Sequence, residues 1–482
     1  MQNNSNRPSH KWRRALRLVA IALLPIALSG CAGFSEDRGM MPVSRFAAAT
    51  LDKDVTVIRT PDEAAMVRQT VDRLKRRPLT ANSAVQIALL NNRRLQAAYH
   101  ELAMAEAERV GDSLPPNPSF SLSRIAGGGA SELEAQVALD ILALVTLPAR
   151  ADLAATRFRQ AQLRAIEETL RTAADVRRAY YAAVSNRELV TLLRQADAAA
   201  KTTAQLAHKL GETGALNKLD QAREQVFHAE TTADLATARQ QADSSREELA
   251  RLLGFWGADL DFRLPETLPA LPARLASQPS IEVEAVSRRV DLQIARTELQ
   301  VIAKAYGLTQ ATRFINLLDV AGLAKRSKDN DGGILRERGL DMQVQIPLFD
   351  FGEVRVRQAE AAYMAAVNRL TDRAITVRSE ARDAYRRYRA SYDIARHYQR
   401  EIIPLRQIIT EENQLRFSAM QIDVFALLQE ARQRIAALRA AIEAKRSFWF
   451  ANVNLQTAVI GGGTAADIRE PSRVSAADAP VH

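Results

Sequence analysis

The stretch from Gly339 to Glu353 changes its hydrophobic period, and this change constrains the fold more than any other feature of the sequence. Up to Leu348, apolar and polar residues alternate, which is the period of a strand with one apolar and one polar face. Asp350 is a good helix N-cap with Glu353 at the spacing of a capping box, and a polar, Ala-rich helical pattern then continues for more than about sixty residues. The sequence predicts a strand that leads into a very long helix.

The chain contains this arrangement twice. Residues 132–141 alternate in the same way before another long helical pattern. The segment that starts at Leu95 recurs at an offset of 197 residues, the strand segment at Leu133 recurs at 207, and the turn at Gly214 recurs at 206. An insertion in the polar stretch 324–333 accounts for the increase of the offset from 197 to 207, and we interpret this stretch as an exposed loop. We predict a two-fold repeat of helix, β-hairpin and long helical hairpin.

The repeat defines the expected domains. Residues 79–254 form the first repeat and residues 280–460 the second, and a Pro-rich connector, 255–279, joins them. In the first repeat a helical pattern over 148–210 covers roughly 60 residues, or about 90 Å at 1.5 Å per residue. A helix of that length does not fit into one compact domain. The polar tail 461–482 is expected to be disordered.

Four amphipathic strands are expected, at about 118–126, 131–147, 313–323 and 339–349. Their apolar and polar faces suit a transmembrane barrel with lipid outside and water inside. Four strands cannot close a barrel, and an open sheet edge is not tolerated in hydrocarbon, so the missing strands must come from other copies. A trimer would supply twelve strands. The alternative that the strands leave open is a soluble sandwich, or a small sheet that caps a coiled coil.

The amino terminus, residues 1–30, is predicted to be a signal peptide. A basic segment that ends at Arg17 precedes the apolar run Leu18 to Leu28, which is too short to span a bilayer comfortably. The run ends in Leu-Ser-Gly-Cys31, which resembles a bacterial lipobox and makes Cys31, the single cysteine, the expected site of a covalent lipid. The alternative is an ordinary signal peptide with a chance cysteine. Ala32 follows where an Asp would favour the inner membrane, so the resemblance points to the outer membrane.

The segment after the lipidation site, residues 31–78, is mixed and polar. Pro42, Pro61 and Pro78 interrupt it, so we expect an extended, lipid-anchored leader that lies along a larger body.

Charge and composition argue against a nucleic-acid partner. The formal net charge is +10, but residues 1–30 contain five of the basic residues and no acid. Elsewhere Arg alternates with Glu and Asp along helices, and no basic run with interleaved aromatics is present. The six histidines are scattered, and His208 and His228 lack a third ligand, so no metal site is expected. No catalytic constellation is recognisable, and we expect that the chain is not an enzyme.

The order and duplication of these elements, over about residues 79–455, resemble the TolC-type outer-membrane efflux channels, specifically their lipoprotein branch. The run 345–352 contains the Pro-Leu-Phe-Asp core and the following Gly of the family's strand-to-helix junction. Asn91-Asn92 and the segment 116–119 are similar to its first helix and first strand entry. The resemblance implies a mainly α fold with membrane β structure: a trimeric twelve-stranded β-barrel continued by an α-helical tunnel.

The same resemblance implies that the tunnel narrows at two helical turns, 211–219 and 417–425. Met420 stands where the family usually has Gly, and Gln429 stands where it has a second acid. For Asn217 and Asp423, a role as helix caps and nothing more is an equal alternative. The candidate aperture residues are Asp423, Asn217, Asp220 and Gln429, and the candidate adaptor-docking residues are Gly214, Leu216, Met420 and Ile422.

The implied function is an exit duct in the outer membrane of a Gram-negative cell, for drugs or metal ions. Its implied partners are two further copies of the chain, a periplasmic adaptor and an inner-membrane pump of the RND type. The turn 214–217, with Leu219 and 223–225 after it, resembles the metal-exporting branch of the family. The second hypothesis is a periplasmic coiled-coil adaptor or scaffold lipoprotein without a pore. An adaptor should carry one helical hairpin flanked by lipoyl-like β segments, whereas this sequence predicts two helical hairpins.

Overall fold

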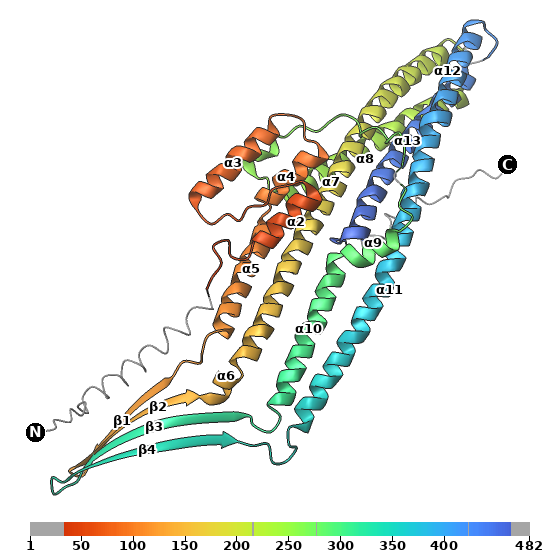
Figure 1. Ribbon diagram of the computed structural model, residues 1–482. Helices are drawn as coiled ribbons and strands as arrows, with labels where there is room; N and C mark the ends of the chain where they lie inside the picture. Colours follow the sequence, from red (N-terminus) through yellow and green to blue (C-terminus); the bar gives the residue numbers. More distant parts are fainter. Residues whose placement is uncertain (1–32, 215, 276, 423, 464–482) are drawn as a thin grey trace, which may run out of the picture. The chain divides into compact units, whose positions relative to one another are not determined.

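The computed structural model describes residues 33–463 except 215, 276 and 423 (Figure 1). It is mainly helical and contains one four-stranded antiparallel sheet. In the part of the chain from residue 33 onward, two helices precede the repeats: α2 (Met41–Leu51) and α3 (Pro61–Lys75). The first repeat consists of α4 (Ala81–Asn91), α5 (Arg93–Asp112), β1 (Ser119–Gly127), β2 (Ala130–Asp140), α6 (Ile141–Val145), α7 (Leu147–Glu212) and α8 (Lys218–Leu253).

A short 3-10 helix, η1 (Gly257–Leu260), follows the first repeat. The second repeat consists of α9 (Ile281–Arg288), α10 (Val290–Ala311), β3 (Leu317–Lys328), β4 (Ile334–Gln345), α11 (Glu353–His397), the π-helical turn η2 (Tyr398–Ile402), α12 (Ile403–Ser418) and α13 (Val424–Ile460). Among the helices that the structure describes, none is both long and apolar enough to cross a membrane.

The predicted internal repeat is confirmed down to single backbone positions. Asn92 separates α4 from α5 with φ −66° and ψ 119°, and Arg289 separates α9 from α10 with φ −64° and ψ 122°. These two extended residues are 197 positions apart, which is the offset found in the sequence. The same local interruption of a helix therefore occurs at equivalent places in both repeats.

Contacts divide the chain into two compact units. The first includes residues up to Met41, Glu101–Gln162 and Ala295–Leu370, and it contains the whole sheet. The second includes Pro42–His100, Leu163–Ile294 and the chain from Thr371 onward. The boundaries of the repeats therefore differ from those of the units. Each repeat contributes its hairpin and the adjoining helical segments to the first unit, and its remaining helical segments to the second.

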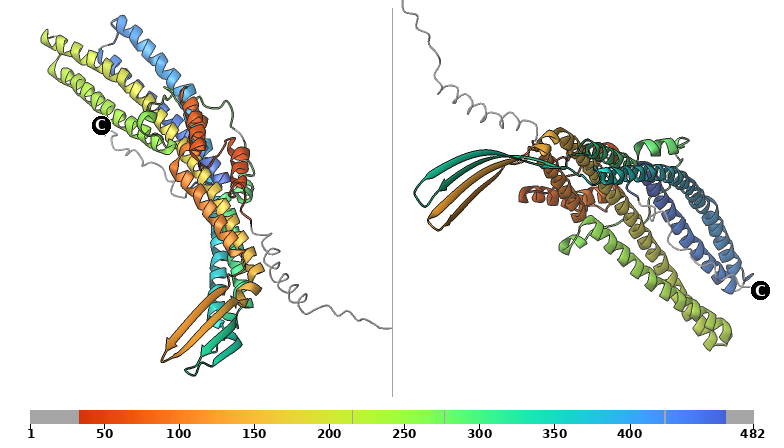
Figure 2. Two further views of the ribbon diagram at one scale, coloured as in Figure 1. Left: turned by 90° about the vertical axis from the view of Figure 1, so that its left-hand side faces the viewer. Right: turned by 90° about the horizontal axis from the view of Figure 1, so that it is seen from below.

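The four strands lie in the order β1-β2-β3-β4 (Figure 2). β2 was expected to extend to residue 147, but it ends at Asp140, whose Oδ1 accepts a hydrogen bond from Ala143 N at 2.7 Å and caps α6. The first strand is shifted by one residue from the expected 118–126.

The second hairpin also differs from the expectation. β3 and β4 were expected at 313–323 and 339–349, with an exposed loop at 324–333. β3 instead extends to Lys328, and β4 starts at Ile334. A tight turn joins the two strands, and in it Asp329 N donates a hydrogen bond to Gly333 O at 3.0 Å. At the other end the ladder stops at Gln345 because Pro347 has no N–H to donate.

The expected extended leader is wrong, since α2 and α3 are helices. Pro61 begins α3 instead of breaking it, because proline at the first helical position loses no helical hydrogen bond. Thr60 and Glu63 form a capping box around it. The signal peptide and Cys31 lie outside the described residues, so their predicted roles stay predictions.

The expected tail is wrong for its first three residues. Gly461 and Gly462 are buried, and Gly462 has a φ of 84°. A Cβ on Gly462 would come within 2.6 Å of Leu170 Cβ and 2.7 Å of Arg171 N, so only glycine fits this close approach. The remainder of the expected tail, 464–482, lies outside the described residues.

Candidate channel elements and aperture turns

The register of the sheet separates its side chains into two faces. Residues directly opposite each other across a ladder point to the same face, and successive residues on a strand alternate. One face, here called the polar face, includes Ser121, Ser123, Glu132, Glu134, Gln136, Asp140, Asp319, Lys325, Glu337, Asp341 and Gln343. The other, the apolar face, includes Phe120, Leu122, Leu133, Val137, Leu139, Leu318, Val320, Leu340, Met342 and Val344.

The other residues that the structure describes leave much of the apolar face exposed. Leu340 is 83% exposed and Phe120 is 69% exposed. A contiguous apolar surface of this kind marks contact with a membrane or a partner. The arrangement agrees with the faces predicted from sequence and suits a strand that has hydrocarbon on one side and water on the other.

The junction between β4 and α11 depends on two residues with positive φ. Phe351 has a φ of 48° and Gly352 a φ of 74°. A Cβ on Gly352 would lie 2.3 Å from the backbone oxygen of Arg313, so only glycine fits there. Asp350 does not begin the helix as expected: its Oδ1 accepts from Gly352 N at 3.1 Å, and α11 begins three residues later, at Glu353.

The predicted capping box at this junction is also wrong, because the Glu353 carboxylate has other partners. Its Oε1 accepts from Arg357 Nε at 2.9 Å, and its Oε2 accepts from Arg313 Nη2 at 2.8 Å. The hydrogen bond from Arg357, followed by the charges of both arginines, holds the pKa of Glu353 below its usual range. Arg313 Nε also donates to Phe351 O at 2.9 Å. The Arg313 side chain therefore binds Phe351 and Glu353, the residues on either side of Gly352.

The first aperture turn, between α7 and α8, has the form that its residues predict. Gly214 ends α7 with a φ of 74°, and its N–H donates to Gly211 O at 3.1 Å. Asn217 is the N-cap of α8, with its Oδ1 accepting from Asp220 N at 2.9 Å. The Asp220 carboxylate accepts from Asn217 Nδ2 at 2.6 Å and pairs with Arg223 at 3.1 Å. Asn217 and Asp220 are therefore brought together, and the capping role of Asn217 is confirmed.

The second aperture turn, between α12 and α13, closes with a Schellman motif. Met420 N donates to Phe417 O at 3.0 Å, and Gln421 N donates to Arg416 O at 2.8 Å. Met420 occupies the left-handed position of this motif with a φ of 57°, and its side chain is 93% exposed. Glycine is the residue that normally fills this position, because it has no Cβ to clash.

The remaining candidate residues have varied environments. Leu216 and Ile422 are half-buried, and Gln429 is exposed on α13. Asp423, the principal aperture candidate, lies outside the described residues. His208 lies 3.3 Å from Glu212, and His228 lies 3.8 Å from Asp197. Within the part of the chain that the structure describes, no group of three or more His, Cys, Asp or Glu side chains could hold a metal ion.

The burial of two glutamates close to these turns was not foreseen from the sequence. Glu224 on α8 is 3% exposed and pairs with Arg432 of α13 at 3.0 Å. Glu430 on α13 is 6% exposed and pairs with Arg406 of α12 at 3.0 Å. The two glutamates are 206 residues apart, which is the offset of the aperture turns, so the repeat itself was the signal that could have found them. Burial raises the pKa of Glu224, and the charge of Arg432 opposes this effect.

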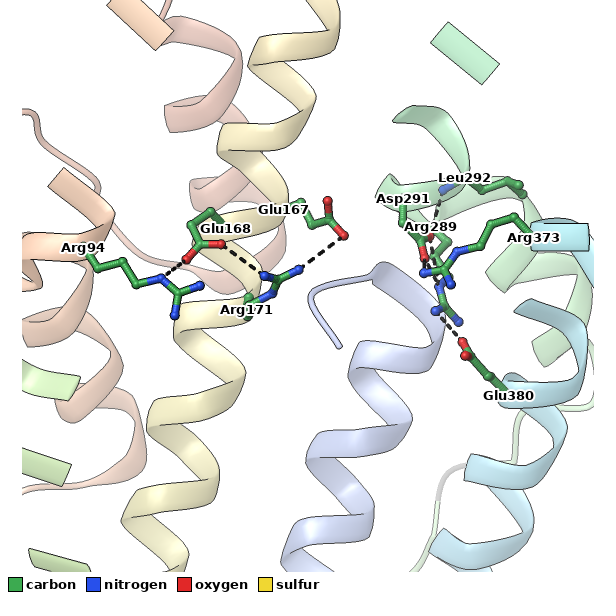
Figure 3. Close-up of polar contacts among 9 residues, drawn as sticks. All are labelled: Arg94, Glu167, Glu168, Arg171, Arg289, Asp291, Leu292, Arg373 and Glu380. Atoms are coloured by element: carbon green, nitrogen blue, oxygen red, sulfur yellow. Dashed lines mark hydrogen bonds and ion pairs between the residues drawn. The ribbon is translucent and has the colours of Figure 1, made fainter. Parts of the chain in front are cut away.

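A second charged group occupies the break between α9 and α10 (Figure 3). Arg289 is 2% exposed, and its Nε donates to both carboxylate oxygens of Asp291 at 3.0 Å. Its guanidinium also pairs with Glu380, and Arg373 pairs with Asp291. At the equivalent break in the first repeat, the neutral Asn92 donates to Leu252 O at 2.8 Å. One backbone feature is thus stabilised by an amide in one repeat and by ion pairs in the other.

Glu167 on α7 belongs to the neighbouring chain of polar contacts, which runs through Arg171 and Glu168 to Arg94 (Figure 3). Burial is the main cause that raises the pKa of Glu167, and the negative charge of Asp291 adds to it. Glu167 is therefore a carboxylate whose ionised form is poorly stabilised by its surroundings.

The comparisons with known proteins agree with this geometry. Residues 283–418 match the model of the outer membrane efflux protein family. The outer-membrane channel OprN is 20% identical to this chain, and the match has a TM-score of 0.66. The aligned region covers 86% of this chain and 95% of the OprN chain. The Campylobacter jejuni CmeC outer membrane channel is 16% identical, with coverages of 87% and 92% and a TM-score of 0.63.

The open state of the Neisseria gonorrhoeae MtrE outer membrane channel is also 16% identical, with coverages of 79% and 88% and a TM-score of 0.62. A search of curated proteins found no match. The chain shares the fold of these channels, and the predicted resemblance to the TolC-type channels is confirmed.

Proposed function

We propose that this chain, which has the fold of the TolC-type outer-membrane efflux channels, is the exit duct of a tripartite efflux system. It would carry small toxic solutes from the periplasm to the exterior. The observation that carries the proposal is a sheet with one polar and one exposed apolar face, built from two repeats whose strands lead into long helices. Such a sheet can have lipid on one side and a water-filled path on the other.

The observed elements favour the duct over the alternative of a periplasmic adaptor. The chain has two helical hairpins, one formed by α7 and α8 and one by α11 to α13, and two strand pairs in one sheet. An adaptor without a pore has no use for an exposed apolar sheet face. OprN, CmeC and MtrE, which share the fold, are outer-membrane channels.

A homotrimer is part of the proposal. The sheet has two free edges, β1 and β4, and free edges cannot lie in hydrocarbon. Three copies would join these edges into a closed barrel of twelve strands, an even number within the known range. The polar faces would then line the water-filled lumen.

The partners are proposed from the resemblance to the TolC-type channels, and the lipid anchor from the lipobox-like sequence that ends at Cys31. A periplasmic adaptor would dock on the aperture turns around Gly214, Leu216, Met420 and Ile422, and an RND-type inner-membrane pump would drive transport. Asp423, Asn217, Asp220 and Gln429 are the residues that we propose near the aperture. A covalent lipid on Cys31 would anchor the chain in the outer membrane of a Gram-negative cell, and the duct needs no other cofactor and no catalytic group.

The proposal is tested with full-chain protein purified from outer membranes. We expect a trimeric mass in detergent and discrete single-channel conductance in a planar bilayer. A monomer without conductance would contradict the proposal. An export assay with a deletion strain, challenged separately with metals, dyes and antibiotics and complemented by the wild-type gene, identifies the cargo. Labelling with radioactive palmitate, with Cys31→Ser as the matched control, tests the lipid anchor.

A further inference from the structure

The carboxylates of the sheet all lie on one of its two faces. The polar face has six carboxylates and a single cation, Lys325, which pairs with Glu132 at 2.7 Å. The apolar face has five cations and no carboxylate. These five residues, here called the basic band, are Arg124 of β1, Arg326 and Lys328 of β3, and Arg336 and Arg338 of β4.

The register places the basic band on adjacent rows of the apolar face. One row across the sheet consists of Arg124, Leu133, Arg326 and Arg336. The row on one side of it contains Lys328, and the row on the other side contains Arg338. All five side chains are exposed. In the part of the chain that the structure describes, none of them forms an ion pair with a carboxylate.

This arrangement is unfavourable for the protein alone. Arg326 and Arg336 are directly opposite each other in the β3–β4 ladder. Side chains in such a pair start about 5 Å apart, and like charges there destabilise a sheet. The carboxylates of the sheet could have relieved the repulsion, but all of them lie on the other face. Within the four described strands no carboxylate remains to neutralise the band, whereas an anion from outside the chain could do so.

The surroundings of the band restrict what that anion can be. The next row contains Phe120, Val137 and Leu340, and the apolar surface continues along β4 through Met342 and Val344. The ligand must therefore place an anionic group beside the arginines and apolar chains beside the neighbouring rows. A soluble anion satisfies only the first condition, whereas a lipid with a phosphorylated headgroup satisfies both.

The position of the band along the strands agrees with a lipid headgroup. From Leu340 the apolar side chains of this face continue to Val344, at the end of β4 that leads to α11. The helices join the other end of the strands, so the basic band lies at the edge of the hydrocarbon remote from the helices.

We infer that the basic band is a binding site for phosphate groups of lipids in the outer leaflet of the outer membrane. The inference rests on the proposed function, because it requires the apolar face to be in contact with lipid. Arginine suits the role, since its planar guanidinium donates two parallel hydrogen bonds to a phosphate. In the proposed trimer, joining β4 to β1 of the next copy would make the band continuous around the barrel.

The test is lipid binding by full-chain trimers in detergent, followed by native mass spectrometry. The probes are a diphosphorylated, acylated disaccharide lipid, the same lipid after enzymatic removal of both phosphates, and inorganic phosphate alone. We expect the phosphorylated lipid to bind in preference to the other two. Arg326→Gln combined with Arg336→Gln should weaken its binding by about tenfold, since each loses charge-assisted hydrogen bonds.

The single variant Arg336→Gln is measured as well, and Lys325→Gln is its matched control, because each removes one cation, from β4 and from β3, on opposite faces of the sheet. The control should bind the phosphorylated lipid as the wild type does. Equal affinity for the two lipid forms, unchanged binding by the double variant, or an equal loss in Lys325→Gln would overturn the inference while the wild type still conducts. A wild type without trimer or conductance would instead overturn the proposed function, and this inference with it.

Discussion

Gly214 and Met420 occupy the same left-handed position at the ends of α7 and α12, with φ values of 74° and 57°. They are 206 residues apart, which is the offset of the internal repeat. In the first turn the left-handed position is filled by glycine, which adopts it without strain. In the second turn it is filled by methionine, whose Cβ disfavours this conformation. The two turns therefore differ in stability because of backbone strain at Met420.

Met420→Gly should stabilise the second turn. The left-handed conformation costs a residue with a Cβ about 1–2 kcal/mol, and part of that gain is lost to the larger unfolded-state entropy of glycine. We expect a net gain of about 0.5–1 kcal/mol, measured as slower hydrogen exchange at the ends of α12 and α13. Met420→Ala, which keeps a Cβ, should show no gain. Equal protection in the two variants would contradict the strain argument.

Arg432→Ala should destabilise the helices near the aperture turns, because it leaves the buried carboxylate of Glu224 without its partner. A loss of about 1–3 kcal/mol is expected for an unsatisfied buried group. The measurement is the free energy of unfolding in denaturant. Combining Arg432→Ala with Glu224→Gln should recover part of the loss, since the unpaired charge is then gone. Additive losses in the double variant would argue against the pairing.

Arg289→Ala should be among the most damaging single changes in the chain. It removes the cation between Asp291 and Glu380, both of which are buried. Removing one partner from a buried ion pair costs about 3–5 kcal/mol. The neighbouring Arg288 pairs with Glu284 at the surface, so Arg288→Ala should cost less than about 1 kcal/mol. The free energies of unfolding of the two variants are measured in parallel. Similar losses of stability in both would contradict the prediction.

Glu167→Gln should change how stability depends on pH. Burial, aided by Asp291, raises the pKa of Glu167 in the folded protein above its unfolded value. Below the unfolded pKa the carboxyl is protonated in both states and causes no penalty. As pH rises through the raised folded pKa, ionisation increasingly costs folding free energy. The variant should therefore be more stable than wild type at neutral pH, with the difference shrinking on acidification.

Glu168→Gln provides the control for this pH dependence. Glu168 pairs with Arg94 at 2.9 Å, and its loss removes a favourable contact. This variant should not gain stability at neutral pH. Thermal unfolding of the three proteins between acidic and neutral pH is the measurement. A constant difference between Glu167→Gln and wild type across the whole range would contradict the assignment.

Asp423→Ala should loosen the closed state of the duct. In the proposed trimer, three Asp423 carboxylates at one constriction would hold counter-ions and order the turn. We expect a larger single-channel conductance or a larger open fraction in planar bilayers. Asp393→Ala, which removes an exposed carboxylate of α11 outside both turns, is the control. Conductance and open fraction unchanged from wild type would count against this role of Asp423.

The fold could be predicted largely from sequence because its main determinants are local. The alternation around Leu340 and Leu133 identified strands, and the offsets between repeats identified the duplication before any contact was known. Strand ends were less accurate. The segment 324–333 was expected to be a loop because it is rich in Lys, Asp and Gly, yet its first five residues belong to β3, since hydrogen bonds to β2 and β4 outweigh the preference of single residues.

The sequence by itself determined the repeat, the two faces of the strands and the turn residues, because periodicity and capping depend on neighbours along the chain. Tertiary structure alone decided which charges meet. Glu224 and Arg432 are 208 residues apart in the chain, and Arg289 and Glu380 are 91 apart. Their burial depends on how separate helices pack, which no local pattern contains. The same holds for the basic band: only the register across four strands places its five cations on one face.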